Sequence, residues 1–329
     1  MKDFAGKIAV VTGGGTGMGR ELVCQLVVEG AHVAMCDVSA ENMAETAAIA
    51  NPAEGIRVTQ HVCDVSSEEQ MNRFRDEVVA QHETDHVNLI FNNAGIGGGG
   101  EVVTGDRADW ERTFGVCWYG VYFGCRAFMD LLVASEEGHI VNTSSVNGFW
   151  ATIGPNVSHT SYSAAKFAVK GFTEALVTDL RLNAPHVKAS VVMPGHIGTS
   201  IAINSNIVLG KGTALEMSEE DVGELRERLL AAGAPVGNVP DDHLREMMHQ
   251  RGLDFRDKAP TTAGQAATII LDGVREERWR ILVGDDAVAL DAMVRAEPEN
   301  AYEPDFLERF KGQGHFQELI QATDETETN

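Results

Sequence analysis

Short apolar runs alternate with amphipathic stretches through the first two-thirds of the chain, and this rhythm limits the possible folds more than any other feature. The runs are Ile8–Thr12, His32–Asp37, Arg57–Val62, Val87–Asn92, His139–Thr143 and Lys188–Met193. The helical stretches between them are Gly17–Glu29, Ala40–Ala50, Ser67–Gln81, Asp109–Ala134 and Ser161–Leu182. Such an order predicts an α/β fold, in which right-handed crossovers build a doubly wound parallel sheet with helices on both faces.

The alternation stops after Pro194 and returns near residue 262. An excursion of about sixty residues is too long for a bare loop, so we expect helices within it. The expected elements are a capped helix from Ser218 to about Gly233, a second helix over Pro240–Arg251 that ends at Gly252, a third helix over Thr262–Val274 and a buried strand over Trp279–Val283. The expected organisation is a main domain made of residues 1–199 and 262–285, a helical insertion over 200–261 and a surface extension over 286–329.

Charge and composition narrow the classes of partner. The chain has 49 acidic and 26 basic residues and a formal net charge of −23. An average field of this sign disfavours nucleic acid and anionic membrane surfaces. We see no signal-peptide pattern and no run of the roughly 20 apolar residues that cross a bilayer. The five cysteines form no CxxC pair and no metal-ligand cluster, so we expect a cytoplasmic protein with reduced thiols and no metal site.

A glycine cluster, Gly13-Gly14-Gly15-Thr16-Gly17-Met18-Gly19, joins the first apolar run to the first helical stretch. Without Cβ atoms the backbone can turn tightly and approach a pyrophosphate, and the free N–H groups at the start of a helix face the anion. An ordinary tight turn would use similar residues. The position of the cluster in the first βαβ unit favours a dinucleotide phosphate site.

The second apolar run ends in Asp37, eighteen residues after Gly19. A carboxylate at this point accepts hydrogen bonds from the adenosine ribose hydroxyls and repels a 2′-phosphate. Neither Thr16, Val38 nor Ser39 supplies the cation that a 2′-phosphate needs. We therefore predict NAD as the cofactor, with a solvated strand-end aspartate as the alternative interpretation.

Six motifs, in one order, resemble the short-chain dehydrogenase/reductase family. They are Thr12-Gly13-x-x-x-Gly17-x-Gly19, Asp64-Val65, Asn92-Asn93-Ala94-Gly95, Ile140-Val141-Asn142-Thr143-Ser144-Ser145, Tyr162-Ser163-Ala164-Ala165-Lys166 and Pro194-Gly195-His196-Ile197-Gly198-Thr199. The match covers roughly residues 5–200 and returns around 262–285. The resemblance implies a Rossmann sheet, an oxidoreductase acting on CH–OH groups, and a homodimer or homotetramer. The cofactor contacts that it implies are Gly13, Gly17, Met18, Gly19, Asp37, Asp64, Val65, Asn93, Ala94, Gly95, Tyr162, Lys166, Pro194, Gly195, Ile197 and Thr199.

The resemblance also makes Ser145, Tyr162 and Lys166 the catalytic residues. Tyr162 and Lys166 are four apart on an expected helix, so they share one face. A free phenol has a pKa of about 10, and a nearby ammonium and an oxidised nicotinamide both favour the phenolate. Tyr162 is then expected to take the alcohol proton, or to return it in the reverse direction, while Ser145 orients the substrate oxygen. An isolated pair of this kind would instead be read as a packed aromatic beside a surface lysine.

The sequence departs from the family pattern in two places. Cys117 stands where members usually carry an asparagine, which holds a water that joins the lysine to a proton relay. A thiol is a weaker partner, which leaves three outcomes open: a backbone carbonyl and water suffice, Asn147 substitutes, or turnover is reduced. Cys117 could also simply pack the helix. Ser145 and Tyr162 are further apart than usual, which implies an insertion of about four residues within Phe149–Thr160.

The substrate side depends on the helical insertion, which we expect to act as a lid that excludes water. Expected lining residues are Trp150, Met193, Ile197, Ile201 and Leu209, and the predicted substrate contacts are Ser145, Trp150 and Ile201. These side chains suggest an apolar, bulky secondary alcohol or its ketone. Phe149 and Trp150 could equally be core residues or oligomer contacts, and the insertion could pack against a second subunit.

The predicted function is therefore that of an NAD-dependent dehydrogenase with a small-molecule substrate. The alternatives are an NADPH-dependent carbonyl reductase and a nucleotide-binding regulatory protein with impaired catalysis. The intact Ser145, Tyr162 and Lys166 argue against the regulatory protein.

Overall fold

The structure is a computed structural model that describes residues 1–98, 100–152, 158–231 and 234–312. Seven parallel strands form one sheet in the order β3-β2-β1-β4-β5-β6-β9. They are β1 (Ile8–Thr12), β2 (His32–Asp37), β3 (Val58–Val62), β4 (Leu89–Asn92), β5 (Gly138–Thr143), β6 (Val187–Pro194) and β9 (Arg280–Val283). The predicted doubly wound α/β fold is confirmed. The strand order reverses between β1 and β4, which opens a crevice at the carboxyl ends of these strands.

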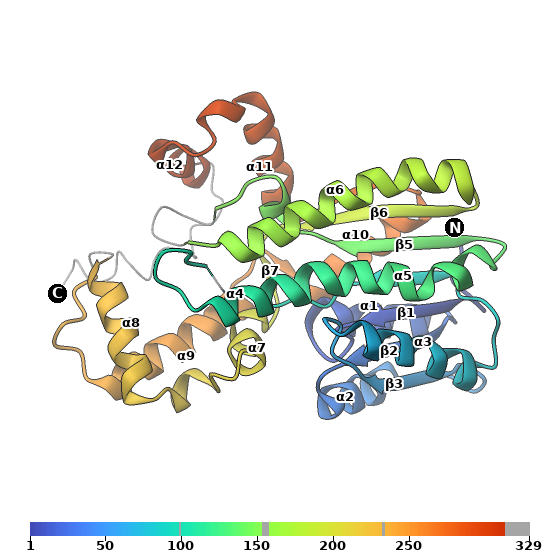
Figure 1. The fold of residues 1–329 in the computed structure, drawn as a ribbon, viewed down its shortest axis with the longest axis horizontal. Coiled ribbons are helices and arrows are strands. Elements are labelled where there is room, and N and C mark those ends of the chain that lie inside the picture. Colours follow the sequence, from blue (N-terminus) through green and yellow to red (C-terminus); the bar gives the residue numbers. More distant parts are fainter. Residues whose placement is uncertain (99, 153–157, 232–233, 313–329) are drawn as a thin grey trace.

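Helices cover both faces of the sheet (Figure 1). Successive residues of β1 belong to different core clusters: Ile8 and Val10 to one, Ala9 and Val11 to the other. This is the alternation that a strand buried on both faces must show. The first cluster is covered by α3 (Glu68–His82), α5 (Gly120–Val133) and α6 (Thr160–Asn183), and the second by α1 (Gly17–Val28), α2 (Ala40–Ala50) and α10 (Ala263–Arg275).

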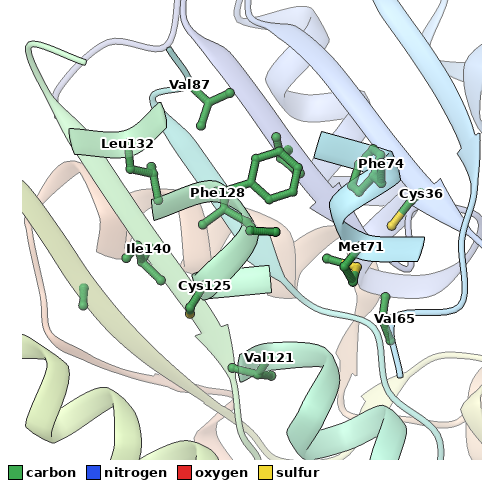
Figure 2. Packing of buried hydrophobic residues seen from close by; sticks show 14 of the residues in the cluster. Cys36, Val65, Met71, Phe74, Val87, Val121, Cys125, Phe128, Leu132 and Ile140 are labelled. Carbon is green, nitrogen blue, oxygen red and sulfur yellow. The ribbon is translucent and has the colours of Figure 1, made fainter. Parts of the chain in front are cut away.

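Aromatic packing is prominent in the first cluster, which Figure 2 shows from close by. Phe74 of α3 meets Phe128 of α5 edge to face, with 5.4 Å between ring centroids. Both side chains are buried, as are Met71 and Leu132 beside them. Burial of one such side chain stabilises the fold by roughly 1.5–3 kcal/mol, so this layer fixes how α3 and α5 lie on the sheet.

The helix expected over Asp109–Ala134 consists of α4 (Arg107–Phe114), a π-helical turn η1 (Gly115–Tyr119) and α5. The prediction had the right extent and missed the π-helical turn. Gly120 lets this helix approach the loop after β3, because a Cβ there would lie 2.7 Å from Val65 Cγ2. By length and composition, residues 107–133 could cross a bilayer, but half of their most apolar window is buried inside the protein, as in a core helix.

The insertion after β6 contains α7 (Ile201–Val208), a short η3 (Ala214–Glu216), α8 (Glu219–Ala231) and α9 (Asp241–Asp257). Figure 1 shows α7, α8 and α9 gathered at one end of the sheet. Its two ends meet in a second, two-stranded sheet of β7 (Ile197–Gly198) and β8 (Thr261–Thr262). The insertion therefore leaves and rejoins the main domain at one place.

The predicted end of a helix at Gly252 is wrong, because α9 continues through this residue to Asp257. Gly252 does not have the positive φ of a helix-ending glycine. A Cβ at this position would lie 2.9 Å from Ile203 Cγ1, so the glycine serves the close approach of α7 and α9. A close helix contact and a helix end require the same residue type, and only the tertiary structure distinguishes them.

The C-terminal extension contains α11 (Asp285–Ala296), a short η4 (Pro298–Asn300) and α12 (Pro304–Gly312). It has a core of its own, in which Leu290, Phe306 and Phe310 are buried. Trp150 belongs to this core and is 2 % exposed. The extension is thus a packed part of the fold over the described residues, rather than a strip that only hugs the surface.

Candidate active site

The glycine cluster forms a tight turn at the start of α1. Gly13 and Gly17 have φ values of +66° and +55°, which favour glycine. A Cβ on Gly19 would lie 1.9 Å from the Gly13 carbonyl oxygen, so no other residue fits there. Among the described residues, no side chain caps the N-terminus of α1, whose N-cap is Thr16. These N–H groups are therefore available to an anion, as a phosphate site requires.

Asp37 ends β2 beside this turn. Its Oδ2 accepts a hydrogen bond from Gly15 N at 3.0 Å, and its Oδ1 accepts one from Ser39 N at 3.0 Å. Arg20 is also tied to the turn, because its guanidinium donates to Gly15 O and pairs with Glu45. The carboxylate is thus fixed in direction and keeps further lone pairs for a ligand.

The asparagine motif after β4 links three strands. The backbone N–H groups of Asn93 and Ala94 donate to Thr12 Oγ1 at 3.0 and 3.1 Å. Asn92 Nδ2 donates to Asn142 Oδ1 at 2.8 Å, which joins β4 to β5. Asn93 Oδ1 is buried and has no hydrogen-bond partner among the described residues. An unpaired buried acceptor beside the glycine turn fits a site that is completed by a bound group.

Asp64 follows β3 and is committed to its neighbours. Its Oδ1 accepts from Ser66 Oγ at 2.7 Å, and its Oδ2 pairs with Arg112 Nη1 at 2.7 Å. Burial raises the pKa of Asp64, but the hydrogen bonds from Ser66 and Arg112 outweigh it and the pKa lies below its usual value. The Val65 side chain is buried in the core beneath Gly120. Any adenine contact at this point must share Asp64 with Arg112.

The three predicted catalytic residues meet at the carboxyl end of β5. Ser145 lies just after β5, and Tyr162 and Lys166 lie on the first turns of α6. Ser145 lies close enough to Tyr162 for hydrogen bonding to lower the pKa of the phenol. Lys166 Nζ donates to Thr143 O at 2.9 Å and lies 5.3 Å from the centroid of the Tyr162 ring. The predicted shared face of Tyr162 and Lys166 is thus present.

Electrostatics at this pair differ from the simplest expectation. Burial raises the pKa of Tyr162, the Cys117 thiol raises it further, and the hydrogen bond with Ser145 lowers it. Burial also lowers the pKa of Lys166. In the protein alone, desolvation therefore dominates and keeps the phenol neutral. The sequence spacing showed the cation, but it could not show how deeply the pair is buried.

Cys117 lies in the π-helical turn next to this pair. Its Sγ donates to Ile96 O at 3.2 Å, and the residue is fully buried. A Cβ on Gly95 would lie 3.5 Å from Lys166 Nζ and 3.8 Å from Cys117 Sγ, so the three groups share one small space. Asn147 Nδ2 is committed elsewhere, since it donates to the carbonyls of Trp150 and Thr152 at 3.0 Å each.

The loop after β6 is held from two sides. His196 N donates to Asp286 Oδ2 at 2.6 Å, and a Cβ on Gly195 would lie 2.2 Å from the same oxygen. His196 Nε2 lies 2.7 Å from Phe255 O of α9, with 4.3 Å between the two ring centroids. Sequence reasoning missed Asp286, which lies about ninety residues away in the first turn of α11. Its only sequence signal was a pair of acidic residues at a helix start.

The insertion begins on the glycine turn. A Cβ on Gly17 would lie 3.1 Å from Thr199 Cγ2, and Asn204 Nδ2 of α7 donates to Thr16 Oγ1 at 3.2 Å. A cavity of about 1900 Å³ lies between the insertion and the carboxyl ends of the strands. Its wall includes the following predicted residues: Met18, Asn93, Gly95, Ser145, Tyr162, Lys166, Pro194, Gly195, Ile197, Thr199, Ile201 and Leu209. The structure therefore brings most of the predicted site residues to one space.

Two predicted lining residues are not on this wall. Trp150 packs against Phe306, with 5.8 Å between ring centroids, and its Nε1 donates to Ala301 O at 2.7 Å. The prediction of Trp150 as a substrate contact is therefore wrong, because the C-terminal extension covers the indole. Met193 is fully buried within β6. The insertion was inferred within Phe149–Thr160, and residues 153–157 of this segment lie outside the described residues.

A family model for short chain dehydrogenases matches residues 7–207. The chain belongs to the short-chain dehydrogenase family. Relatives of this short-chain dehydrogenase include the putative oxidoreductase SadH of Mycobacterium tuberculosis, with 35% identity over 90% of this chain and 92% of SadH. Mouse epidermal retinol dehydrogenase 2 is 33% identical over 61% of this chain and 63% of its own.

Solved structures agree with this assignment. A short chain dehydrogenase/reductase from Burkholderia phymatum in complex with NAD is 29% identical, covers 92% of this short-chain dehydrogenase and 98% of its own chain, and has a TM-score of 0.71. A metagenomic short-chain oxidoreductase in complex with NADP is 30% identical over 58% of this chain and 83% of its own, with a TM-score of 0.52. Both nicotinamide cofactors thus occur among the structural relatives.

Proposed function

We propose that this short-chain dehydrogenase is an NAD-dependent enzyme that interconverts an apolar, bulky secondary alcohol and its ketone. The observation that carries the proposal is the joined arrangement of Ser145, Tyr162 and Lys166 on the wall of one cavity with the asparagine and proline-glycine loops. A protein that only bound nucleotide would have no need to bring Ser145, Tyr162 and the buried Lys166 together on this wall.

The residues present fit a dinucleotide. The turn of Gly13, Gly17 and Gly19 would hold the pyrophosphate, and the unpaired Asn93 Oδ1 offers an acceptor at the cavity wall. The loop Pro194–Thr199 would lie against the nicotinamide. When bound, the oxidised nicotinamide supplies the hydride acceptor and a positive charge.

The proposed proton chemistry uses this chain's own side chains. Ser145 donates a hydrogen bond to the substrate oxygen and orients it towards Tyr162. Tyr162 accepts the alcohol proton in the oxidation direction and returns it in the reduction direction. Lys166, fixed by Thr143 O, lies on the same helix face, where a positive charge would favour the phenolate of Tyr162. The lid excludes water while the proton moves.

We infer the preference for NAD over NADP from Asp37. Its carboxylate is oriented by Gly15 N and Ser39 N, where it would accept from ribose hydroxyls and repel a 2′-phosphate. Arg20, the cation that hydrogen bonds bring to this turn, is neutralised by Glu45. We infer the apolar character of the substrate from Ile197, Ile201 and Leu209 on the cavity wall.

A cofactor and turnover experiment tests the proposal. We expect NADH to bind at least tenfold more tightly than NADPH, as measured by quenching of protein fluorescence. The lost charge-assisted hydrogen bond and the repulsion of the 2′-phosphate together cost NADPH more than about 1.4 kcal/mol of binding free energy. Asp37→Ala should reduce this preference, with Asp85→Ala, an exposed aspartate far along the chain, as the matched control.

Turnover is measured as NADH formation with a panel of cyclic and aromatic secondary alcohols. Binding of NADH without turnover of any alcohol would contradict the proposed enzymatic activity and favour a regulatory protein. Tighter binding of NADPH would contradict the role of Asp37 and favour a carbonyl reductase.

We also propose a homo-oligomer in the cytoplasm. Tyr119 and Tyr122 are exposed on the π-helical turn and α5, and Tyr122 packs with Trp118 and Phe172. An exposed aromatic face of this kind is typical of a protein contact. Light scattering would give the mass in solution, and a monomer of 35.5 kDa at micromolar concentration would contradict this part of the proposal.

A further inference from the structure

His159 stands beside the catalytic tyrosine, and the reaction described above does not use it. It directly precedes α6 and lies on the cavity wall together with Ser145 and Tyr162. Its ring stacks on the ring of Tyr162, with 4.7 Å between centroids and 20° between planes. The imidazole is therefore in contact with the side chain that carries the proton.

The backbone around His159 is fixed by one carbonyl group. Gly100 O accepts hydrogen bonds from Ser158 Oγ at 2.7 Å and from Thr160 Oγ1 at 2.6 Å, and Thr160 N donates to it at 3.2 Å. Trp110 Nε1 donates to Thr160 Oγ1 at 2.9 Å. The hydroxyls on both sides of His159 are thus already bonded, and the residue between them is held in place.

One ring nitrogen of His159 lacks a partner. Nδ1 is buried and has no hydrogen-bond partner among the described residues. Leaving such a group unpaired is costly, so a buried orphan beside a cavity calls for a ligand. Burial lowers the pKa of His159 to about 4, so the ring is neutral at pH 7. A neutral imidazole offers one donor and one acceptor, which suits an uncharged oxygen better than a carboxylate.

We propose that His159 is a specificity-determining residue that hydrogen-bonds a second, uncharged oxygen of the substrate, a hydroxyl or keto group next to the reacting carbon. The inference rests on the proposed function, because Ser145 and Tyr162 then bind the reacting oxygen. The stacking places the imidazole on the face of the Tyr162 ring, so the oxygen that the imidazole binds lies close to the reacting oxygen. The substrate class is a vicinal diol or hydroxyketone with apolar bulk towards Ile201 and Leu209.

The test compares two matched substrates in three proteins. The substrates are cyclohexanol and cyclohexane-1,2-diol, which differ by one hydroxyl, and the readout is the ratio of their kcat/KM values with saturating NAD. The proteins are the unmodified chain, His159→Phe and His159→Gln. Phenylalanine keeps an aromatic ring on Tyr162 and removes both nitrogens, whereas glutamine keeps a donor and an acceptor. A His159→Leu protein serves where the Phe protein does not fold.

We expect the unmodified chain to favour the diol by about 10- to 100-fold, as for a site whose polar group is left unpaired by the analogue. The ratio should fall towards one in His159→Phe or His159→Leu and recover in part in His159→Gln. An unmodified chain that oxidises both alcohols without preference would overturn the inference, as would a folded Phe or Leu protein that keeps the full preference. Failure to oxidise either alcohol would count against the proposed function instead.

Discussion

Asp286 gives the sharpest prediction, because the structure shows what this residue does for a loop far from it in the chain. Its carboxylate is 2 % exposed and accepts from His196 N at 2.6 Å, in the loop proposed to lie against the nicotinamide. Asp286→Ala removes the acceptor and leaves a buried N–H group. A hydrogen bond to a charged group contributes about 1.5–3 kcal/mol, so we expect the free energy of unfolding to fall by this amount.

The same loss should appear in cofactor binding. Two contacts of His196 hold the loop, one with Asp286 and one with Phe255 O of α9. Loss of the first contact should leave the loop less well fixed. A loss of about 1.4 kcal/mol corresponds to a factor of ten, so the KM for NAD should rise about 10- to 100-fold. Urea unfolding and initial rates at varied NAD concentrations measure the two effects.

Asp291 provides the matched control on the same helix. It pairs with Arg280 Nη1 at 2.9 Å and with Arg295 Nε at 3.0 Å, and these contacts lie away from the loop. Asp291→Ala should therefore reduce stability by a similar amount without changing the KM for NAD. Equal KM values for NAD in the two variants, at equal loss of stability, would refute the positioning role of Asp286.

Three further predictions concern catalysis and pH. Tyr162→Phe should lower kcat by at least about 100-fold while NADH binding changes little. Stopped-flow measures kcat and fluorescence titration measures NADH binding, and persistent turnover would contradict the role of Tyr162. Cys117→Ser should keep kcat within about threefold, because a hydroxyl can replace the thiol as donor to Ile96 O; a loss above tenfold in steady-state assays would indicate thiol chemistry. Burial lowers the pKa of His139 to about 3, so the neutral ring contributes stability above the unfolded pKa of about 6.5 that is lost as pH falls towards 3. In His139→Asn, the free energy of unfolding measured with urea should depend less on pH between pH 4 and 6.5, and its slope should fall by up to about 1.4 kcal/mol per pH unit. An unchanged slope would contradict this prediction.

The site divides into residues that local patterns reveal and residues that only long-range packing reveals. Tyr162 and Lys166 were predictable because four positions on a helix return to the same face. Trp150 was misplaced, since an aromatic residue near an active site looks the same in the sequence whether it meets a substrate or Phe306. Gly252 was misread for a similar reason, as a helix end and a close helix contact favour the same residue.

Period and order in the chain were sufficient for the doubly wound sheet and the glycine turn, because these depend on strand and helix periodicity and on the turns between neighbouring elements. The catalytic residues were implied by the resemblance to the family, since the spacing of Tyr162 and Lys166 alone fixes only a shared helix face. The folded structure alone placed Asp286 under the loop of His196, buried Trp150 beneath the C-terminal extension and stacked His159 on Tyr162 with an unpaired nitrogen. It also reversed the expected shift at Tyr162, where burial raises the pKa of the phenol. Desolvation and contacts between distant segments depend on the whole packed interior, and no local pattern carries that information.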